Sequence, residues 1–470
     1  MSRARAPRAT ITLVFAVLAG ASSVRAQAPV AIEPAPVARA RLDSLMAIVK
    51  AEEARVRAGL GIEVNWDRLA RAWFQVGDHG RAAKSLERAR AIGAREFDTV
   101  LLSGRVARSE GRFAEAVDWL ERAVRMRPDD WEAHEDLGHA LYLEGRFAAA
   151  AQHWDRARAL PGSGSPDRSA LTAVLRTVGE APYRITGRGR ERVRFVPQGT
   201  RGGLVMPVTV NGRGPLLFRI DAGSPECVLA SSVARELGLV AGEADAAGDR
   251  LAYTVLDSLA IGATTLHRLP VGVSGHPGFA TEGGVRGLLG FEALRRFRFC
   301  VDPRDSMLTL EPLPPAGAQA PADSARPAWL PAGAAAHRVP VLLRGTHLLI
   351  AYGRVNQGPE RPFLLDIGSP GPALAAPAST LDEAGVAIDS TRVQTGTSAG
   401  GRVGYLDVQI ARLCIGGACR DSLAGAYGTF PARLELNPNF RLAGVVSNGF
   451  LAGYRCAVDL SRAEAWLIEP

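Results

Sequence analysis

A five-residue element occurs twice in the 470-residue chain, 145 positions apart. The apolar run Leu216–Ile220 leads into Asp221-Ala222-Gly223-Ser224-Pro225, and the apolar run Phe363–Leu365 leads into Asp366-Ile367-Gly368-Ser369-Pro370. Short apolar runs that end in a turn containing glycine and proline are typical of β-strands. A strand that enters the same acidic turn twice predicts two β-rich halves of similar plan, with Asp221 and Asp366 at equivalent positions.

The similarity of the two halves continues after each aspartate. A glycine-containing hairpin with a tyrosine is present in both, at Gly248–Tyr253 and at Gly400–Tyr405. Each half then closes on a short apolar run, Gly287–Gly290 in the first and Gly444–Ser447 in the second. The high glycine and proline counts, 51 and 30, fit short strands joined by tight turns.

Both halves resemble retropepsin-type aspartic protease domains. In these domains an apolar strand enters Asp-Thr/Ser-Gly-Ala/Ser, a flap hairpin comes next, and Gly-Ile/Leu-Leu-Gly precedes a short helix and two final strands. The resemblance covers residues 200–313 as lobe 1 and 337–470 as lobe 2, with the Pro/Ala-rich stretch 314–336 as linker. It implies that one chain builds the pseudo-twofold site that single-domain relatives build by dimerising. The residues that it assigns are the catalytic pair Asp221 and Asp366, the supporting loop residues Gly223, Ser224, Gly368 and Ser369, and the flap candidates Gly248, Tyr253, Gly400, Gly401 and Tyr405.

Electrostatics defines what such a pair can do. Two carboxylates about 3 Å apart cannot both ionise cheaply, so they share one proton and supply one base and one acid. The base can activate a water while the acid donates to a peptide carbonyl oxygen. We expect Ser224 and Ser369 to hydrogen-bond to the carboxylates and orient them. Ala222 and Ile367 stand where the family has Thr or Ser, so the hydroxyl-to-backbone bonds that brace the two loops are expected to be missing.

The N-terminal part has a different repeat, with a step of 34 residues. Gly77, Gly111 and Gly145 keep this step, and so do several alanines between them. Small residues at a fixed step predict paired helices that bury their apolar faces only against the next unit. This part, residues 37–164, resembles tetratricopeptide repeats, with units at 63–96, 97–130 and 131–164. The resemblance implies a surface for a peptide or protein partner; the alternative is a spacer that only positions the two β-rich halves.

Residues 165–199 are predicted to connect the helices to lobe 1. They contain a helix over Ser169–Val178 and then a strand with alternating arginines, whose pattern fits a charged, exposed sheet edge. Within the helical part, His134 and His139 are five residues apart and point in different directions on a helix, so they do not form a zinc-protease pair.

The first 26 residues have the pattern of a cleaved secretory signal. They contain four arginines and no acidic residue, an apolar run over 11–18, and small residues before Ala26. We expect cleavage near Ala26 and a periplasmic or secreted protein with no membrane span after cleavage. These arginines account for half of the net charge of +8, and the remainder gives no reason to expect a nucleic-acid partner.

All five cysteines come after residue 226. Cys414 and Cys419 flank a Gly-Gly turn, where facing positions of a hairpin bring the two Cβ atoms within bonding reach, so they are the disulfide candidates. A Cys227–Cys300 pair and simple buried thiols remain alternatives, with Cys456 left over in the first case. The spacing contains no second pair suited to zinc, and no metal or cofactor is expected.

The sequence therefore predicts a multidomain α + β protein: a tetratricopeptide-like helical array followed by two mainly-β, pepsin-type lobes. The predicted function is that of an exported aspartic endopeptidase acting on a peptide or protein. Two alternatives remain: a non-catalytic peptide-binding module on a decayed protease scaffold, and an enzyme that dimerises through its first lobe. Pepstatin-sensitive cleavage with an acidic optimum would favour the enzyme.

Overall fold

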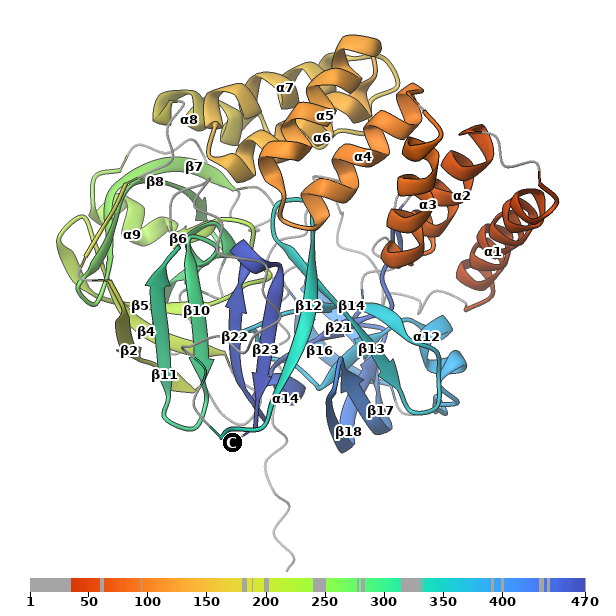
Figure 1. Cartoon of the computed structure of the whole chain (residues 1–470). Helices are drawn as coiled ribbons and strands as arrows, with labels where there is room; N and C mark the ends of the chain where they lie inside the picture. Colours follow the sequence, from red (N-terminus) through yellow and green to blue (C-terminus); the bar gives the residue numbers. More distant parts are fainter. Residues whose placement is uncertain are drawn as a thin grey trace, which may run out of the picture.

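The structure is a computed structural model that places a helical array over two β-rich lobes (Figure 1). It describes residues 35–59, 63–93, 95–179, 184–187, 189–197, 203–239, 251–276, 279, 284–313, 330, 333–389, 393–398, 401–430, 435–437 and 440–469. The signal candidate and most of the predicted linker lie outside these ranges. None of the helices in the described ranges is both long and apolar enough to cross a membrane.

The helical array confirms the 34-residue repeat. Gly104 and Gly138 occupy the same position in successive units, and a Cβ there would lie 2.5 Å from Leu120 Cγ and from Trp154 Cδ1, respectively. Paired helices can therefore approach closely only because these positions lack a side chain. The helices are α1 (Ala35–Arg57), α2 (Glu63–Gln75), α3 (His79–Ala91), α4 (Phe97–Ser109), α5 (Phe113–Met126), α6 (Trp131–Glu144), α7 (Phe147–Ala159) and α8 (Ser169–Val178).

Lobe 1 is built on an eight-stranded sheet in the order β1-β8-β6-β9-β5-β4-β3, with β7 pairing to both β4 and β8. The turn between β4 and β5 contains Asn211 and Gly212, both with positive φ, as a tight hairpin requires. The elements are β1 (Arg184–Thr186), β2 (Glu191–Arg194), β3 (Val196–Pro197), β4 (Leu204–Val210), β5 (Arg213–Ile220), β6 (Cys227–Ala230), α9 (Ser231–Glu236), β7 (Ala252–Ile261), β8 (Thr264–Ser274), β9 (Val285–Leu289), α11 (Phe291–Leu294), β10 (Phe297–Asp302) and β11 (Met307–Pro312).

Lobe 2 repeats this order of elements. As β5 pairs in parallel with β9, so β14 pairs in parallel with β21, and each pair precedes a short helix. The elements are β12 (Ala336–Arg344), β13 (Leu348–Val355), β14 (Arg361–Leu365), β15 (Leu374–Ala376), α12 (Ala378–Glu383), β16 (Gln394–Ser398), β17 (Gly401–Ile415), β18 (Ala418–Tyr427), β19 (Leu436–Asn437), β20 (Phe440–Arg441), β21 (Val445–Val446), α14 (Asn448–Leu451), β22 (Arg455–Asp459), η1 (Leu460–Arg462) and β23 (Glu464–Ile468).

The final strands of the two lobes join them in one sheet. β10 of lobe 1 pairs antiparallel with β22 of lobe 2, with Phe299 opposite Val458 and Val301 opposite Cys456. The strands continue outward as β12-β23-β22 on one side and β10-β11-β2 on the other. β2 carries the arginine stripe and ends this sheet, as an exposed edge strand does. Although β2 and β3 fall in the predicted connector, they pair with β11 and β4, so part of that segment belongs to the β-structure of lobe 1.

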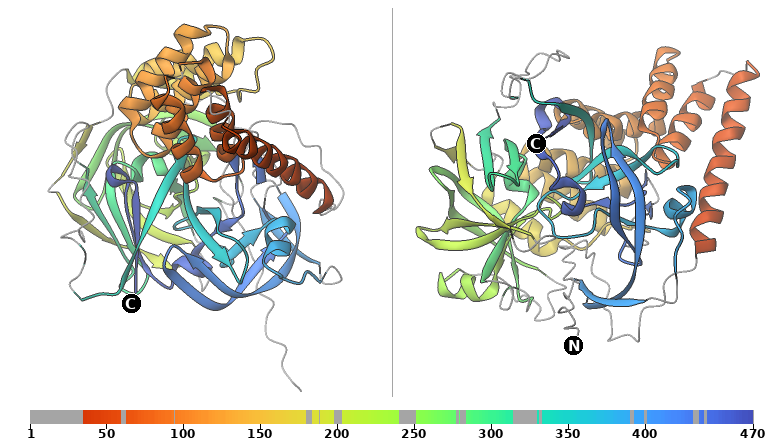
Figure 2. Two further views of the ribbon diagram at one scale, coloured as in Figure 1. Left: turned by 45° about the vertical axis from the view of Figure 1, so that its right-hand side comes forward. Right: turned by 90° about the horizontal axis from the view of Figure 1, so that it is seen from below.

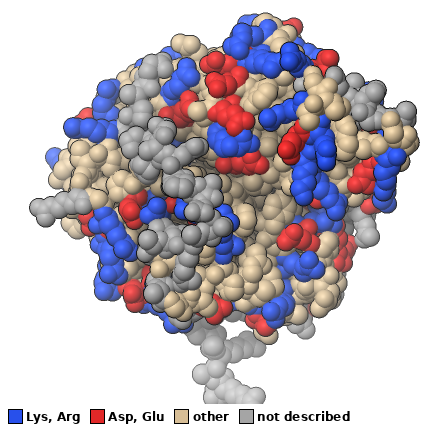
Figure 3. Space-filling model, in the orientation of Figure 1, with Lys and Arg blue, Asp and Glu red and all other residues tan. Residues whose placement is uncertain are grey.

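The helical array contacts both lobes. Seen from below, lobe 1 in green and lobe 2 in blue lie side by side, with helices behind both (Figure 2). A single hydrophobic cluster runs from the array through both lobes and includes Leu137, Leu175, Phe218 and Phe363. On the face of the molecule shown in Figure 3, basic and acidic side chains are interspersed rather than gathered in one basic stripe.

Candidate active site

The aspartates of the duplicated element lie at the ends of equivalent strands. Asp221 follows β5 and Asp366 follows β14, and both side chains are almost completely buried, at 1% and 5% exposure. Their backbone N–H groups make the same bond in each lobe: Asp221 donates to the carbonyl of Leu289 (3.1 Å) and Asp366 to that of Val446 (2.9 Å). The parallel pairing of strands therefore fixes both aspartates in equivalent positions.

The two carboxyl groups meet over Gly223. A Cβ placed on this glycine would lie 2.6 Å from Oδ1 of Asp366 and 3.3 Å from Oδ1 of Asp221, so both oxygens are close to one point. Ser369, from the loop of lobe 2, donates its hydroxyl to Oδ1 of Asp221 in lobe 1 (3.1 Å). The arrangement needs glycine at 223, because any side chain would displace one carboxylate.

Backbone bonds connect the two loops directly. The Ala222 N–H of one loop donates to the Ile367 carbonyl of the other (3.1 Å), and the N–H of Leu204, at the start of β4 in lobe 1, donates to the Gly368 carbonyl (3.4 Å). Gly368 has a φ of +93°, and a Cβ there would lie 2.5 Å from the Ile220 carbonyl oxygen, so only glycine fits. The missing hydroxyls at Ala222 and Ile367 thus leave the loops joined by main-chain contacts.

The donors around the pair are distributed unequally. Oδ1 of Asp221 accepts from the N–H groups of Gly223 (3.0 Å) and Ser224 (3.1 Å) as well as from Ser369. The equivalent N–H in lobe 2, that of Gly368, donates to Oδ1 of Asn448 instead (3.3 Å). Among the described residues, Oδ2 of Asp221 and Oδ1 of Asp366 are buried and accept no hydrogen bond.

The two serines contact Asp221 in different ways. The Ser224 hydroxyl donates to the carbonyl of Glu226 (2.9 Å) and not to a carboxylate, because the tight turn directs it back along its own loop. Ser224 acts on Asp221 only through its backbone N–H, whereas Ser369 does so through its hydroxyl.

Burial and the neighbouring charges act differently on the two aspartates. Burial raises the pKa of Asp221 to about 6, with the nearby charge of Arg219 and the three hydrogen bonds limiting the rise. Burial, together with the negative charge of Asp221, raises the pKa of Asp366 further, to about 8. Two adjacent buried carboxyl groups with raised pKa values favour a single proton held by the pair.

The closing run of lobe 2 ends in Ser447, where lobe 1 has Gly290, and this difference has a structural compensation. In lobe 1, Gly290 lies so close to the backbone of Glu226 that a Cβ would be 2.0 Å from its carbonyl oxygen. In lobe 2, Ser447 is equivalent to Gly290 and Gly371 is equivalent to Glu226. A Cβ placed on Gly371 would lie only 3.0 Å from the Cβ of Ser447. The missing side chain at Gly371 thus leaves room for the side chain of Ser447.

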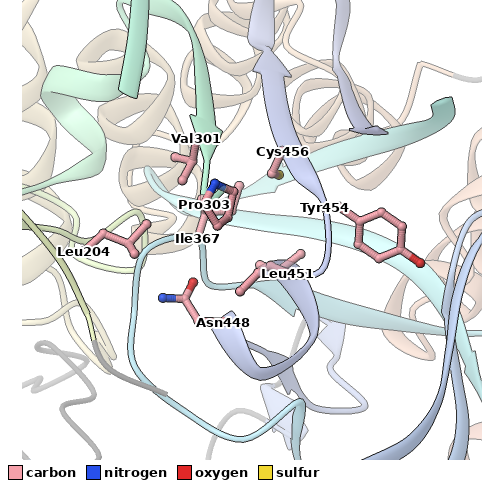
Figure 4. A pocket seen from close by; sticks show the side chains of 9 residues that line it. Leu204, Val301, Pro303, Ile367, Asn448, Leu451, Tyr454 and Cys456 are labelled. Carbon is pink, nitrogen blue, oxygen red and sulfur yellow. The ribbon is translucent and has the colours of Figure 1, made fainter. Parts of the chain in front are cut away.

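A small apolar cavity lies behind the loops, between them and the strands that join the lobes. Its volume is about 10 Å³, close to the space of one water molecule. It is lined by Leu204, Val301, Pro303, Ile367, Asn448, Leu451, Ala452, Tyr454 and Cys456 (Figure 4).

The flap candidates are described only in part. Gly248 and Gly400 lie outside the described residues. Tyr253 lies on β7 and packs against the hydrophobic core, while Gly401 begins β17. Tyr405, on the same strand, donates its hydroxyl to Oε1 of Gln394 across the β16–β17 hairpin (3.1 Å).

The other candidate residues are structural. Cys414 and Cys419 face each other on β17 and β18 and form a disulfide, while Cys227, Cys300 and Cys456 are free thiols. His134 contacts His153 rather than His139. In the ranges that the structure covers, no three His, Cys, Asp or Glu side chains are grouped to hold a metal ion.

Sequence reasoning missed two residues near the pair. Arg219 precedes Asp221 by two positions, so strand alternation directs it to the same side of β5. It is 7% exposed and packs against Gly203, where a Cβ would meet its Cδ at 2.7 Å. Asn448 is the other, and no sequence pattern indicated the hydrogen bond that its side-chain oxygen accepts from the Gly368 N–H. For Arg219 the signal was present, because a charge inside an otherwise apolar strand is uncommon.

Comparison with known families identifies the class of each region. Residues 206–293 match the aspartyl protease family, and residues 101–164 match the tetratricopeptide repeat family. The chain thus contains a region similar to aspartyl proteases and, N-terminal to it, a region similar to tetratricopeptide repeats.

Solved structures of both classes are similar to parts of this chain. A retropepsin-like aspartic protease from Rickettsia conorii is 21% identical over 27% of this chain and 93% of its own, with a TM-score of 0.20. An aspartic proteinase from Irpex lacteus is 10% identical over 60% of this chain and 97% of its own, with a TM-score of 0.36. The tetratricopeptide protein YrrB is 16% identical over 31% of this chain and 73% of its own, with a TM-score of 0.25. A comparison with curated protein sequences found no match.

Proposed function

We propose that this protein is an exported aspartic endopeptidase in which Asp221 and Asp366 hydrolyse peptide bonds with an activated water. The observation that carries the proposal is the meeting of two buried carboxyl groups from symmetric loops over Gly223. Two carboxyls so placed with raised pKa values suit a shared proton. Both aspartates come from one chain, so dimerisation is not needed to bring them together.

In the proposed reaction the two aspartates have different roles. Asp221, whose Oδ1 accepts three hydrogen bonds, is the charged member and takes a proton from the attacking water through its free Oδ2. Asp366 holds the proton and donates it to the carbonyl oxygen of the scissile peptide. The water oxygen bonds to the carbonyl carbon as these protons move. The tetrahedral intermediate collapses when Asp221 passes its proton to the leaving amine, the C–N bond breaks, and one hydroxyl of the intermediate returns a proton to Asp366 as the carboxyl product forms.

A second candidate is a peptide-binding module without turnover, which the absence of hydroxyls at Ala222 and Ile367 favours. Incubation of the mature protein with an unfolded protein substrate over pH 3 to 9, with and without pepstatin, distinguishes the two. Pepstatin-sensitive cleavage supports the endopeptidase, and saturable binding of peptides without products supports the module.

The two serines offer a matched test of the dyad. Ser369→Ala removes a donor to the Asp221 carboxylate, so the pKa of Asp221 rises and the acid limb of the pH–activity profile moves to higher pH. A hydrogen bond to a charged group contributes about 1.5–3 kcal/mol, so activity below the optimum is expected to fall roughly 10- to 100-fold. Ser224→Ala removes a hydroxyl that contacts only a backbone carbonyl, and its acid limb is expected to stay in place. Equal shifts in both variants would argue against the unequal roles.

The proposal also assigns roles to the N-terminal regions. The leader would direct export and be cleaved near Ala26, so N-terminal sequencing of the exported protein should begin near Gln27. The helical array would bind a protein or peptide, for which it offers a groove of about 610 Å³ between α1, α2 and α4, lined by residues that include Arg68, Arg71 and Asp98.

A further inference from the structure

The helical array is connected to the loop of each aspartate by hydrogen bonds and packing contacts. The first connection, in lobe 1, passes through Arg295, which directly follows α11 and is 6% exposed. Its guanidinium donates to the carbonyls of Leu143 (2.7 Å) and Tyr142 (3.1 Å) in the last turn of α6. Both carbonyls lie at the C-terminal end of α6, where that of Tyr142 also accepts from the Gly145 N–H (3.0 Å), so a cation at this end is favourable both as a further donor and against the helix dipole.

The same guanidinium is held by α11. Arg295 donates to both carboxylate oxygens of Glu292 (2.6 and 2.8 Å), which is 1% exposed. The backbone of α11 in turn holds the Asp221 loop: the Phe291 N–H donates to the Ser224 carbonyl (2.8 Å), and the Glu292 N–H to that of Pro225 (3.0 Å). A continuous series of hydrogen bonds therefore leads from α6 to the loop that carries Asp221.

The second connection, in lobe 2, passes through Tyr352 on β13. Its hydroxyl donates to the carbonyl of Gly77 (2.6 Å), in the turn between α2 and α3, and accepts from the N–H of His79 (2.9 Å), the first residue of α3. The same turn touches β14, because a Cβ on Gly77 would lie 2.9 Å from Cγ of Pro362. β14 ends directly before Asp366, and Tyr352 is the register partner of Pro362.

The turn of the β12–β13 hairpin also rises against α4 and α6 (Figure 1), where Arg108 donates to the carbonyl of Gly345 (3.3 Å). This part of the array is covered by the chain itself. The core that is continuous across the array and both lobes adds to these polar contacts.

We propose that the helical array is a structural part of the active site, holding the Asp221 loop through Arg295 and the Asp366 loop through Tyr352. Arg295 and Tyr352 are positioning residues, since neither is a contact of the two carboxyl groups. The catalytic consequence rests on the proposed function, but the positioning itself does not.

The test measures the loops directly, by amide hydrogen exchange in the full chain. Arg295→Ala should speed exchange in the peptide covering 220–226, and Tyr352→Phe in the peptide covering 361–369, each by about tenfold or more. Arg295→Lys keeps the charge but cannot reach all four oxygens, so it should give an intermediate effect and serves if the alanine variant does not fold. Arg286→Gln, which breaks an exposed pair with Glu236 in the same lobe, is the matched control and should change neither peptide.

Cleavage kinetics provide the second measurement. With folding retained, Arg295→Ala should lower kcat more than it raises KM and should move the acid limb upward, because the donors Gly223 and Ser224 lie in the loosened loop. A general loss of stability would lower the fraction of folded protein, but it would not shift the acid limb of the pH–activity profile for the molecules that remain folded. Unchanged exchange in both loops overturns the proposal, whatever the activity. Faster exchange in a protein that cleaves nothing supports the positioning and refutes the endopeptidase function instead.

Discussion

Replacing either aspartate by asparagine is expected to reduce peptide cleavage by roughly 10²- to 10⁴-fold, the usual contribution of a positioned acid or base. Asp221→Asn removes the group that accepts the proton of water, and Asp366→Asn removes the group that donates to the carbonyl oxygen. Asparagine has nearly the same shape as the aspartate it replaces, so the loops keep their contacts. The measurement is the rate of product formation from an unfolded protein substrate. Activity near that of the unmodified protein in either variant would contradict the dyad.

The pH dependence should report both groups. Cleavage falls as pH drops and Asp221 becomes protonated, and it falls again as pH rises and Asp366 loses its proton. Because burial raises both pKa values, the optimum is expected at a less acidic pH than two exposed carboxyl groups would give.

A measurement of the stability of Asp366→Asn shows whether the substitution removes catalysis alone or also disturbs the fold. The pKa of Asp366 is raised in the folded protein above its ordinary value of 3.8, so folding favours its neutral form. Its contribution to stability is complete below about pH 4 and is lost as pH rises through the folded value of about 8. Asparagine cannot ionise, so Asp366→Asn should be more stable than the unmodified protein at pH 8 and nearly equal at pH 4, by urea denaturation. Lower stability at pH 8 would show that the substitution disturbs the fold.

The duplicated plan of the lobes could be predicted from the sequence because it depends on local patterns. Strands entering Asp221 and Asp366, the 34-residue step and the Gly-Gly turn between cysteines each need only neighbouring residues to be recognised. The direction of the Ser224 hydroxyl could not be predicted, since it depends on the turn's geometry. The exchange of Gly290 and Glu226 for Ser447 and Gly371 involves residues 64 to 76 positions apart in each lobe, and nothing local connects them.

The contact between the helical array and the lobes also could not be predicted from the sequence. Its polar residues have the pattern of a solvated helix face, and only the fold shows that they meet lobe 2. Asp136 on α6 is an example: it is 7% exposed and accepts from Arg105 (2.5 Å) and Arg108 (2.9 Å) on α4. The positive charge of Arg344, from the β12–β13 hairpin, also lowers the pKa of Asp136.

Asp136 should therefore be among the residues on which stability depends most. Burial alone would raise its pKa, but Arg105 and Arg108 outweigh this effect and lower it. Asp136→Asn leaves these arginines without the buried carboxylate, and breaking such a pair typically lowers the free energy of unfolding by about 3–5 kcal/mol. Urea denaturation at pH 7 measures the effect. Asp421→Asn is the control: it weakens the exposed pair with Arg412, which is expected to contribute only about 0–1 kcal/mol.

The dependence on pH and a second substitution identify the cause. Because the folded pKa of Asp136 is lowered, its contribution is complete above its ordinary value of 3.8 and is lost as pH falls through the folded value, so the two proteins should become more alike in strong acid. Replacing Arg108 by methionine in the Asp136→Asn background removes one uncompensated buried charge, so it should recover part of the lost stability. If the double variant is less stable than Asp136→Asn alone, lost packing rather than an unpaired charge accounts for the loss of stability. Side-chain packing would then be the main interaction that stabilises the cluster between α4, α6 and the β12–β13 hairpin.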